Sequence, residues 1–394
     1  MPTRLRRDLL IAAGPGEWRA ALLEDGAAVE LYVERGETRP PGSIQLGRVV
    51  RRAPGLDSAF VEFGDARPGI APVREAAADG IRLDEGARVI VEVRREAQQD
   101  KGARLSTRLR PHSGLDLATL RLGANDLDPP ALLYPAPGLA PALALRLPGP
   151  PDRVLTDDRA PIPELRQAFP AAEIVFAGDW PIDLEAAIEA ALLPSPGLPG
   201  GGIVHIQETR GATVIDVDTG NPAEHSAEAG AIAANLEAAA LIARQLRLRN
   251  IGGGIVIDFI GLEGKARERI RLALAAALRA DPLQPQILGW TKLGHLELVR
   301  PRRCRPLAQA VLEPGSGAMR RRQPVALAHE ALRALWREAR ARPEANWTIG
   351  AAPPVVAALS GPAKPALHAL ENRLGRRIDI IARDADDGFD IAPR

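Results

Sequence analysis

Residues 252–260 read GGGIVIDFI, a run of glycines followed by an apolar segment that ends in Asp258. The β-branched residues predict a buried strand, because Ile and Val pack well on both faces of a sheet. An earlier segment, Ala212–Val217, has the same character and carries Asp216 near its end. Between them, residues 227–249 place apolar side chains at helical spacing, which predicts one long helix. Strand, helix and strand in this order predict an α/β unit.

The neighbouring segments extend this unit to residues 200–303. The further elements that we predict are a strand at Ile203–Gln207, a helix at 264–279 and a strand pair at 287–291 and 294–299. Regular alternation of strands and helices over about 100 residues is typical of an α/β domain with its own core. We therefore expect the α/β core of the protein in this part of the chain.

Asp216 and Asp258 each stand at the carboxyl end of a predicted strand and are separated by 42 residues, room for one crossover helix. Ligands of α/β sheets bind at this edge, where the two carboxylates would meet. Carboxylate oxygens suit Mg²⁺, which keeps further positions for water and phosphate and can activate a water for attack on a phosphodiester. The same residues also fit an ordinary structural role as helix N-caps or turn residues, and pattern alone leaves both explanations open.

Outside residues 200–303 the chain divides by composition. Residues 1–37 predict short antiparallel strands, and residues 38–111 predict a small barrel of the OB type, a common platform for single-stranded nucleic acid. Residues 112–199 are rich in proline, residues 304–324 form a linker, and residues 325–394 predict a small α+β domain. The predicted fold class is thus a multidomain α+β protein with an α/β core.

Composition excludes several classes of protein. The chain has 394 residues, with 51 Lys and Arg against 50 Asp and Glu, so any nucleic-acid binding depends on local patches. One cysteine excludes a disulfide framework and a four-thiolate zinc site within one chain. Without a signal sequence or a long apolar segment, we expect a soluble cytoplasmic protein.

Two regions carry candidate RNA contacts. In the predicted barrel, Phe60 and Phe63 face opposite sides of an extended strand, so one is a candidate stacking platform, although both also fit a core role. Lys101 lies at a predicted hairpin tip, where it is either a phosphate contact or a solvated turn residue. Three arginines close the long helix: Arg244, Arg247 and Arg249. They suit the negative end of the helix dipole, and they are also candidate phosphate contacts because they are close in sequence to Asp258.

Several of these segments together resemble the ribonuclease E/G family. The core motifs are NLEAA (235–239), IARQLRLR (242–249), GGIVIDFI (253–260) and TKLGHLE (291–297). In the barrel, GRV (47–49) and AFVEFG (59–64) look like the S1 RNA-binding domain of that family. The resemblance covers nearly the whole chain except residues 112–160, and it is more specific than any single short motif.

The resemblance implies an endoribonuclease that cuts single-stranded RNA in rRNA or mRNA processing or decay. Asp216 and Asp258 match the metal-binding aspartates, and Asp218 matches a residue that supports the activated water or the scissile phosphate. The implied cofactor is Mg²⁺, with Mn²⁺ as a substitute, and the implied products carry a 5′-phosphate and a 3′-hydroxyl. Phe60 and Lys101 match RNA contacts of the S1 surface. The alternatives are a weak or inactive RNA-binding member of the family and, less favoured by the S1-like barrel, a nuclease acting on DNA.

The chain also departs from the family pattern. The Cys-Pro-x-Cys motif that links two chains through zinc is replaced by RCRP at 303–306, so we expect no structural zinc, and any homodimer would form without it. Residues 112–199 are a reduced RNase H-like or linker region without the segment that senses the RNA 5′ end. Ile70 stands where a second stacking aromatic is usual, and Gly261 replaces an acidic residue. The shorter, ribonuclease G-like form of the family is the nearer match.

Overall fold

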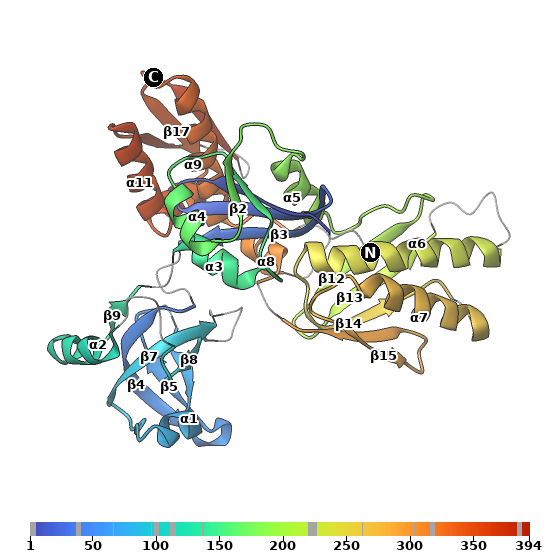
Figure 1. The fold of residues 1–394 in the computed structure, drawn as a ribbon, viewed down its shortest axis with the longest axis horizontal. Helices are drawn as coiled ribbons and strands as arrows, with labels where there is room; N and C mark the ends of the chain where they lie inside the picture. The colour runs from blue at the N-terminus through green and yellow to red at the C-terminus, as the bar shows by residue number, and fades with distance from the viewer. Residues whose placement is uncertain are drawn as a thin grey trace. The chain divides into compact units, whose positions relative to one another are not determined.

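A computed structural model of the chain describes residues 5–36, 41–65, 67–95, 97, 102–110, 116–135, 138–219, 227–261, 263–302, 305–315, 320–383 and 388–394 (Figure 1). The chain folds into two compact units, one of residues 36–143 and one of residues 1–35 together with 144–394. Both α and β elements occur in each unit, so the mixed, multidomain fold class is confirmed. No helix in the described ranges combines the length and the apolar character needed to cross a membrane.

Residues 200–303 form a five-stranded sheet with two helices. The sheet has the order β12-β13-β14-β16-β15, in which β13 and β14 run parallel and the other pairs run antiparallel. The strands are β12 (Ile203–Glu208), β13 (Thr213–Asp218), β14 (Gly253–Asp258), β15 (Gln286–Trp290) and β16 (Leu296–Arg300). The helices are α6 (Ala227–Leu248) and α7 (Gly264–Leu278). Each predicted boundary lies within a few residues of the observed one.

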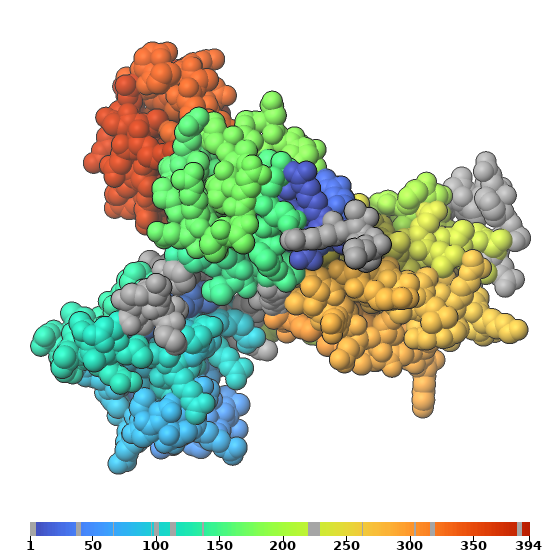
Figure 2. Space-filling model, viewed as in Figure 1, coloured from blue at the N-terminus to red at the C-terminus, as the bar shows by residue number. Residues whose placement is uncertain are grey.

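One face of this sheet is covered and the other is open. Strand residues alternate between the faces: Ile215 and Val217 are buried, whereas Val214 is 41% exposed. The buried residues form one core with apolar side chains of α6 and α7, such as Leu246 and Leu274, so both helices lie on the same face. Figure 1 shows the two helices side by side, and in Figure 2 their side chains form a continuous surface in yellow and orange. Strand residues that point away from this core therefore line an open face.

The larger unit contains two further sheets. The first has the order β11-β10-β1-β2-β3, with β1 parallel to β10. Its strands are β1 (Arg7–Ala13), β2 (Glu17–Glu24), β3 (Ala27–Arg35), β10 (Arg153–Thr156) and β11 (Glu173–Phe176). Helices α3 (Leu139–Arg146), α4 (Ile162–Ala168), α5 (Leu184–Leu192) and α8 (Leu307–Val311) complete this part. The proline-rich segment thus forms more short elements than the sequence predicts, because its prolines lie between elements or in the first turn of a helix, as Pro141 does in α3 and Pro163 in α4.

The third sheet belongs to the C-terminal part of the chain. Its order is β18-β17-β19, built from β17 (Trp347–Ala351), β18 (Asp379–Ala382) and β19 (Phe389–Pro393). The helices are α9 (Pro324–Ala341), α10 (Pro353–Ser360) and α11 (Lys364–Leu374), which share one core with β17. This arrangement agrees with the small α+β fold that the sequence predicts for this region.

Residues 36–143 contain a closed barrel. Strand β4 pairs with both β5 and β7, and β6 and β8 complete a ring of five strands, with β9 added outside it. The elements are β4 (Ile44–Ala53), η1 (Pro54–Leu56), β5 (Ser58–Glu62), β6 (Gly69–Pro72), α1 (Val73–Ala78), β7 (Arg88–Arg95), β8 (Arg104–Ser106), α2 (Leu117–Gly123), η2 (Ala124–Asp126) and β9 (Ala131–Tyr134). A barrel of this kind is consistent with an OB fold. The sequence did not predict β6, because its four residues include glycine and proline.

A buried charged cluster connects β2 to α9. The Glu17 carboxylate, fully buried, accepts hydrogen bonds from Arg35 Nε at 2.7 Å, from Arg19 Nε at 3.2 Å and from Arg333 Nη1. Burial by itself raises the pKa of Glu17, but the guanidiniums of Arg333, Arg35 and Arg19 outweigh it and lower the pKa to about 2. Nearby His329 is buried beside the Pro15 carbonyl, and this burial lowers its pKa to about 4. Glu17 is therefore the carboxylate that compensates three buried cations.

Candidate active site

Asp216 and Asp258 are direct neighbours in the core sheet. They pair in register on the parallel strands β13 and β14, at the carboxyl end of each. Both side chains are exposed, and both alternate with residues that pack under α6 and α7, so they lie on the open face. Neighbouring residues in register have side chains about 5 Å apart at Cβ. The sheet thus brings together the two carboxylates that the sequence placed 42 residues apart.

Asn235, a fully buried residue of α6, fixes the backbone that follows Asp258. Its Oδ1 accepts a hydrogen bond from the Ile260 amide at 3.0 Å, and its Nδ2 donates to the Ile260 carbonyl at 2.9 Å. Both polar groups of the loop backbone at Ile260 are thereby satisfied inside the protein. Asn235 therefore holds the end of β14 against α6 and positions Asp258.

We expect Asn235→Ala to lower the free energy of unfolding by about 1–3 kcal/mol, because it leaves the buried amide and carbonyl of Ile260 without partners. Chemical denaturation of the purified protein measures this change. The control is Gln286→Ala, at an exposed position of the core sheet, which should change the free energy of unfolding by less than about 0.5 kcal/mol. Equal effects of the two substitutions would show that Asn235 does not clamp the loop.

Two histidines flank the aspartates across the open face. His295 Nε2 lies 3.5 Å from Asp258 Oδ2, and the His295 backbone is held in a turn by Thr291, whose Oγ1 accepts from its amide at 3.1 Å. On the other side, His205 pairs in register with Asp216, and its Nδ1 is 2.8 Å from Ser195 Oγ. The sequence pattern predicted no role for either histidine, although His295 lies in the TKLGHLE motif at 291–297. Scattered histidines do not indicate a site until the strand register is known.

The donor set at this edge fits Mg²⁺. Two exposed carboxylates in register supply hard oxygen ligands, and Mg²⁺ in proteins is commonly held by one or two carboxylates while water and phosphate fill the other positions. Within the described ranges, no group of three or more His, Cys, Asp or Glu side chains is arranged to hold a metal ion. The arrangement therefore suits an open two-carboxylate site and not a closed structural one.

Asp218, the third predicted acidic residue, ends β13 two residues beyond Asp216 and is also exposed. Residues two apart on a strand point to the same face, so Asp218 lies on the open face with Asp216. Gly202 packs directly against this strand end: a Cβ there would lie 2.5 Å from the Asp218 carbonyl oxygen. A glycine at 202 is therefore needed for β13 to end where it does.

The arginines at the end of α6 lie far from the aspartates along the sheet. The helix crosses from the carboxyl end of β13 to the amino end of β14, so Arg244, Arg247 and Arg249 come at the opposite edge, on the covered side. Arg244 is exposed. Arg247 is buried and donates to Glu24 through both Nη atoms at 2.9 Å and to Glu30 through Nε at 2.9 Å. These arginines are close to Asp258 in sequence but not in space, because the crossover helix returns the chain to the opposite edge of the sheet.

The barrel residues differ in accessibility. Phe63 is fully buried in the barrel core, whereas Phe60 on β5 is half-buried and pairs in register with Ile70 on β6. The Arg51 guanidinium carbon lies 5.0 Å from the centre of the Phe60 ring, in cation–π contact. Lys101 and Cys304, which the sequence analysis singled out, lie outside the described residues.

Comparisons with known proteins agree with this geometry. The sequence model of the Ribonuclease E/G family matches residues 180–303, the stretch that contains Asp216 and Asp258. Ribonuclease G of Salmonella typhimurium is 27% identical over an alignment of 474 residues, covering 95% of this chain and 96% of the relative. Ribonuclease G of Haemophilus influenzae is 25% identical over 389 residues, covering 75% and 79%. Ribonuclease E of a Nostoc species is 46% identical over 122 residues, which cover 30% of this chain and 18% of the relative.

The match is thus strongest over the α/β core and extends along most of the chain. The family model matches the segment that carries the paired aspartates, and the relative that aligns with 95% of this chain is a ribonuclease G. The segment that carries the paired aspartates thus matches the Ribonuclease E/G family, and relatives named ribonuclease G align with most of the chain.

Proposed function

We propose that this protein is an endoribonuclease that cuts single-stranded RNA at the open face of its core sheet with the help of Mg²⁺. Similarity to the Ribonuclease E/G family supports the assignment as a hydrolase of RNA. The observation that carries the finer proposal is the register pairing of Asp216 with Asp258, both exposed at the carboxyl ends of parallel strands. Exposed strand residues such as Val214 lie on the same sheet face as the paired carboxylates, which leaves room there for an extended RNA strand.

In this proposal each acidic residue has a stated task. Asp216 and Asp258 hold Mg²⁺, with Mn²⁺ as a substitute, and Asp218 orients the attacking water or the scissile phosphate. When bound, the metal supplies positive charge at the phosphodiester and lowers the pKa of a water molecule. His295 Nε2, 3.5 Å from Asp258 Oδ2, positions that carboxylate. Cleavage in this way leaves a 5′-phosphate and a 3′-hydroxyl.

The closed barrel is proposed to be an S1-like OB domain that binds the same RNA. Phe60 supports this role because its ring is half-exposed and already stacks on a guanidinium, as it would on a base. Arg244 is the arginine of α6 that remains exposed for a phosphate contact, since Arg247 is fully paired with Glu24 and Glu30. We also propose the domain boundaries of the sequence analysis and a cytoplasmic location.

Phe60→Ala is expected to weaken binding of a short single-stranded RNA by roughly 1–3 kcal/mol, the value of one base stacked on an aromatic ring. Fluorescence anisotropy in the absence of Mg²⁺ measures binding without cleavage. Phe60→Trp, which keeps an aromatic face, serves as the matched control and should retain the affinity. If both variants bind like the unmodified protein, the ring of Phe60 does not stack on RNA.

The direct test of the proposed function is cleavage of an A/U-rich single-stranded RNA with and without Mg²⁺, beside the same RNA in a duplex. We expect Mg²⁺-dependent cuts in the single strand and little or no cleavage of the duplex. End-group analysis should find 5′-phosphates on the products. Binding of the RNA without cleavage would favour the alternative of an inactive, RNA-binding member of the family.

A further inference from the structure

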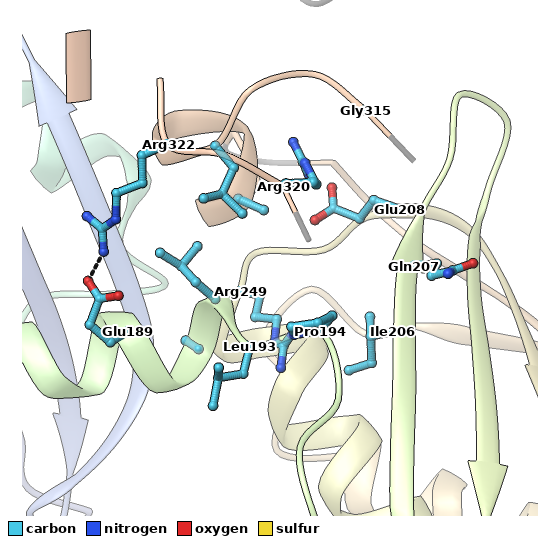
Figure 3. A pocket seen from close by; sticks show the side chains of 14 residues that line it. Glu189, Leu193, Pro194, Ile206, Gln207, Glu208, Arg249, Gly315, Arg320 and Arg322 are labelled. Atoms are coloured by element: carbon cyan, nitrogen blue, oxygen red, sulfur yellow. Dashed lines mark hydrogen bonds and ion pairs between the residues drawn. The ribbon is translucent and has the colours of Figure 1, made fainter. Parts of the chain in front are cut away.

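A separate pocket lies in the larger unit, at the amino-terminal side of the core sheet. It has a volume of about 290 Å³ and is bounded by the end of α5, by β12, by the end of α6 and by the described residues of 308–315 and 320–322 (Figure 3). Its apolar wall includes Leu193, Pro194 and Ile206. Its charged lining comprises Glu189, Glu208, Arg249, Arg320 and Arg322. None of the residues assigned to the cleavage site lines this pocket.

Arg249 is a buried cation that forms no direct ion pair with any residue that the structure describes. It is 5% exposed, its Nε donates to Gln245 Oε1 at 2.6 Å, and its Nη2 has no hydrogen-bond partner among the described residues. The burial lowers the pKa of Arg249 to about 10. Arg247, two residues earlier, is equally buried but is held by two carboxylates. A buried guanidinium without a carboxylate is costly unless an anion compensates it.

The other charges of the pocket are also unevenly paired. Arg322 pairs with Glu189, as Figure 3 shows at one side of the pocket. Arg322 also donates to Glu330 Oε2 at 2.7 Å. Arg320 donates through Nε to the Glu313 carbonyl at 2.9 Å, and it forms no ion pair within the described ranges. Glu208 interacts electrostatically with both Arg320 and Arg249, and burial raises its pKa. Two guanidiniums thus share the charge of one carboxylate.

We propose that this pocket binds a small free phosphate monoester, with the phosphate held by Arg249 and Arg320 and the organic part against the apolar wall. A guanidinium presents paired N–H donors in a plane, which match the oxygens of a phosphate. Leu193, Pro194 and Ile206 provide the apolar surface that inorganic phosphate alone would not need. Since Asp216 and Asp258 lie at the other edge of the sheet, this inference does not depend on the proposed cleavage function.

The test is calorimetric titration of the full-length protein with adenosine 5′-monophosphate, inorganic phosphate and adenosine. We expect the monophosphate to bind and to raise the unfolding temperature, phosphate to bind more weakly, and adenosine not to bind. Arg249→Met should weaken monophosphate binding by about 10- to 100-fold, the loss of a charged hydrogen bond. Glu208→Gln should strengthen it by about fivefold, because a like charge facing the phosphate is removed.

Controls separate loss of the site from loss of the fold. Arg249→Met removes an unpaired buried charge, so without ligand its unfolding temperature should equal or exceed that of the unmodified protein. The exposed Arg279→Gln, at the end of α7 and outside the pocket, should bind the monophosphate normally.

An RNA trimer with a 5′-phosphate, compared with its 5′-hydroxyl form, tests the other source of the same phosphate group. Stronger binding of the phosphorylated trimer, lost in Arg249→Met, would assign the site to an RNA end instead of a free monoester. No binding of the monophosphate, or equal binding by Arg249→Met, would overturn the proposal.

Discussion

Asp258→Asn is expected to lower the rate of RNA cleavage on the order of 10³-fold at a fixed Mg²⁺ concentration, and Asp216→Asn should have an effect of similar size. Each substitution keeps the shape of the side chain but removes one of two charges that hold the metal. The carboxylates are exposed, so neither change should disturb the core. Single-turnover cleavage of a labelled single-stranded RNA measures the rate. Because the two residues serve one ion, the double variant should be little slower than either single variant.

The matched control is Glu268→Gln, which removes one exposed carboxylate from α7, on the covered side of the sheet. It should cleave at the rate of the unmodified protein. Binding of the RNA by Asp258→Asn, measured without Mg²⁺, should be unchanged, which separates loss of chemistry from loss of affinity. If Asp258→Asn and Asp216→Asn cleave at the normal rate, the open face of the core sheet is not the active site.

The second large effect concerns stability. Glu17→Gln should lower the free energy of unfolding by about 3–5 kcal/mol, because it leaves Arg19, Arg35 and Arg333 buried without the carboxylate that compensates them. Denaturation followed by circular dichroism measures the change. Glu338→Gln, at an exposed position of α9, is a suitable control and should change the free energy by less than about 0.5 kcal/mol. A small effect at Glu17 would mean that Glu185, which also pairs with Arg19 and Arg333, compensates the buried arginines.

The same cluster predicts how stability changes with pH. Glu17 has a folded pKa of about 2 against an ordinary value of 4.5, so its contribution is complete above pH 4.5 and is lost as the pH falls toward 2. His329 has a folded pKa of about 4 against 6.5, so the unfolded chain takes up its proton first, and stability falls as the pH drops from 6.5 to 4. His329→Gln should therefore remove the loss of stability between pH 6.5 and 4 and leave the lower window in place.

Much of the α/β core could be predicted from the sequence. Residues such as Ile255 and Ile257 form apolar runs that predict the strands. The helix between the two strands is long enough for a crossover that makes them parallel, so Asp216 and Asp258 were expected at the same edge of the sheet. These features are local in sequence or follow from the handedness and direction of a crossover.

Other features depend on contacts between distant segments. The partners of Arg247 are Glu24 and Glu30, more than 200 residues earlier, and no pattern around Arg247 reveals them. His295 becomes a neighbour of Asp258 only through the register of β14 and β16. The short strand β6 has too few residues, and too much glycine and proline, to show a period.

The pairing of Arg247 with the N-terminal sheet also decides how this protein can be divided. Asn250 donates to the Leu31 carbonyl at 2.8 Å, and Leu248 packs in the core of the N-terminal sheet, so α6 ends inside another domain. Residues 200–303 cut out alone would lose the ion pairs of Arg247 and the hydrogen bond of Asn250, and would expose Leu248 to water. The segment that carries the paired aspartates is therefore not a portable module, and we expect it to fold only together with the strands that receive the end of its helix.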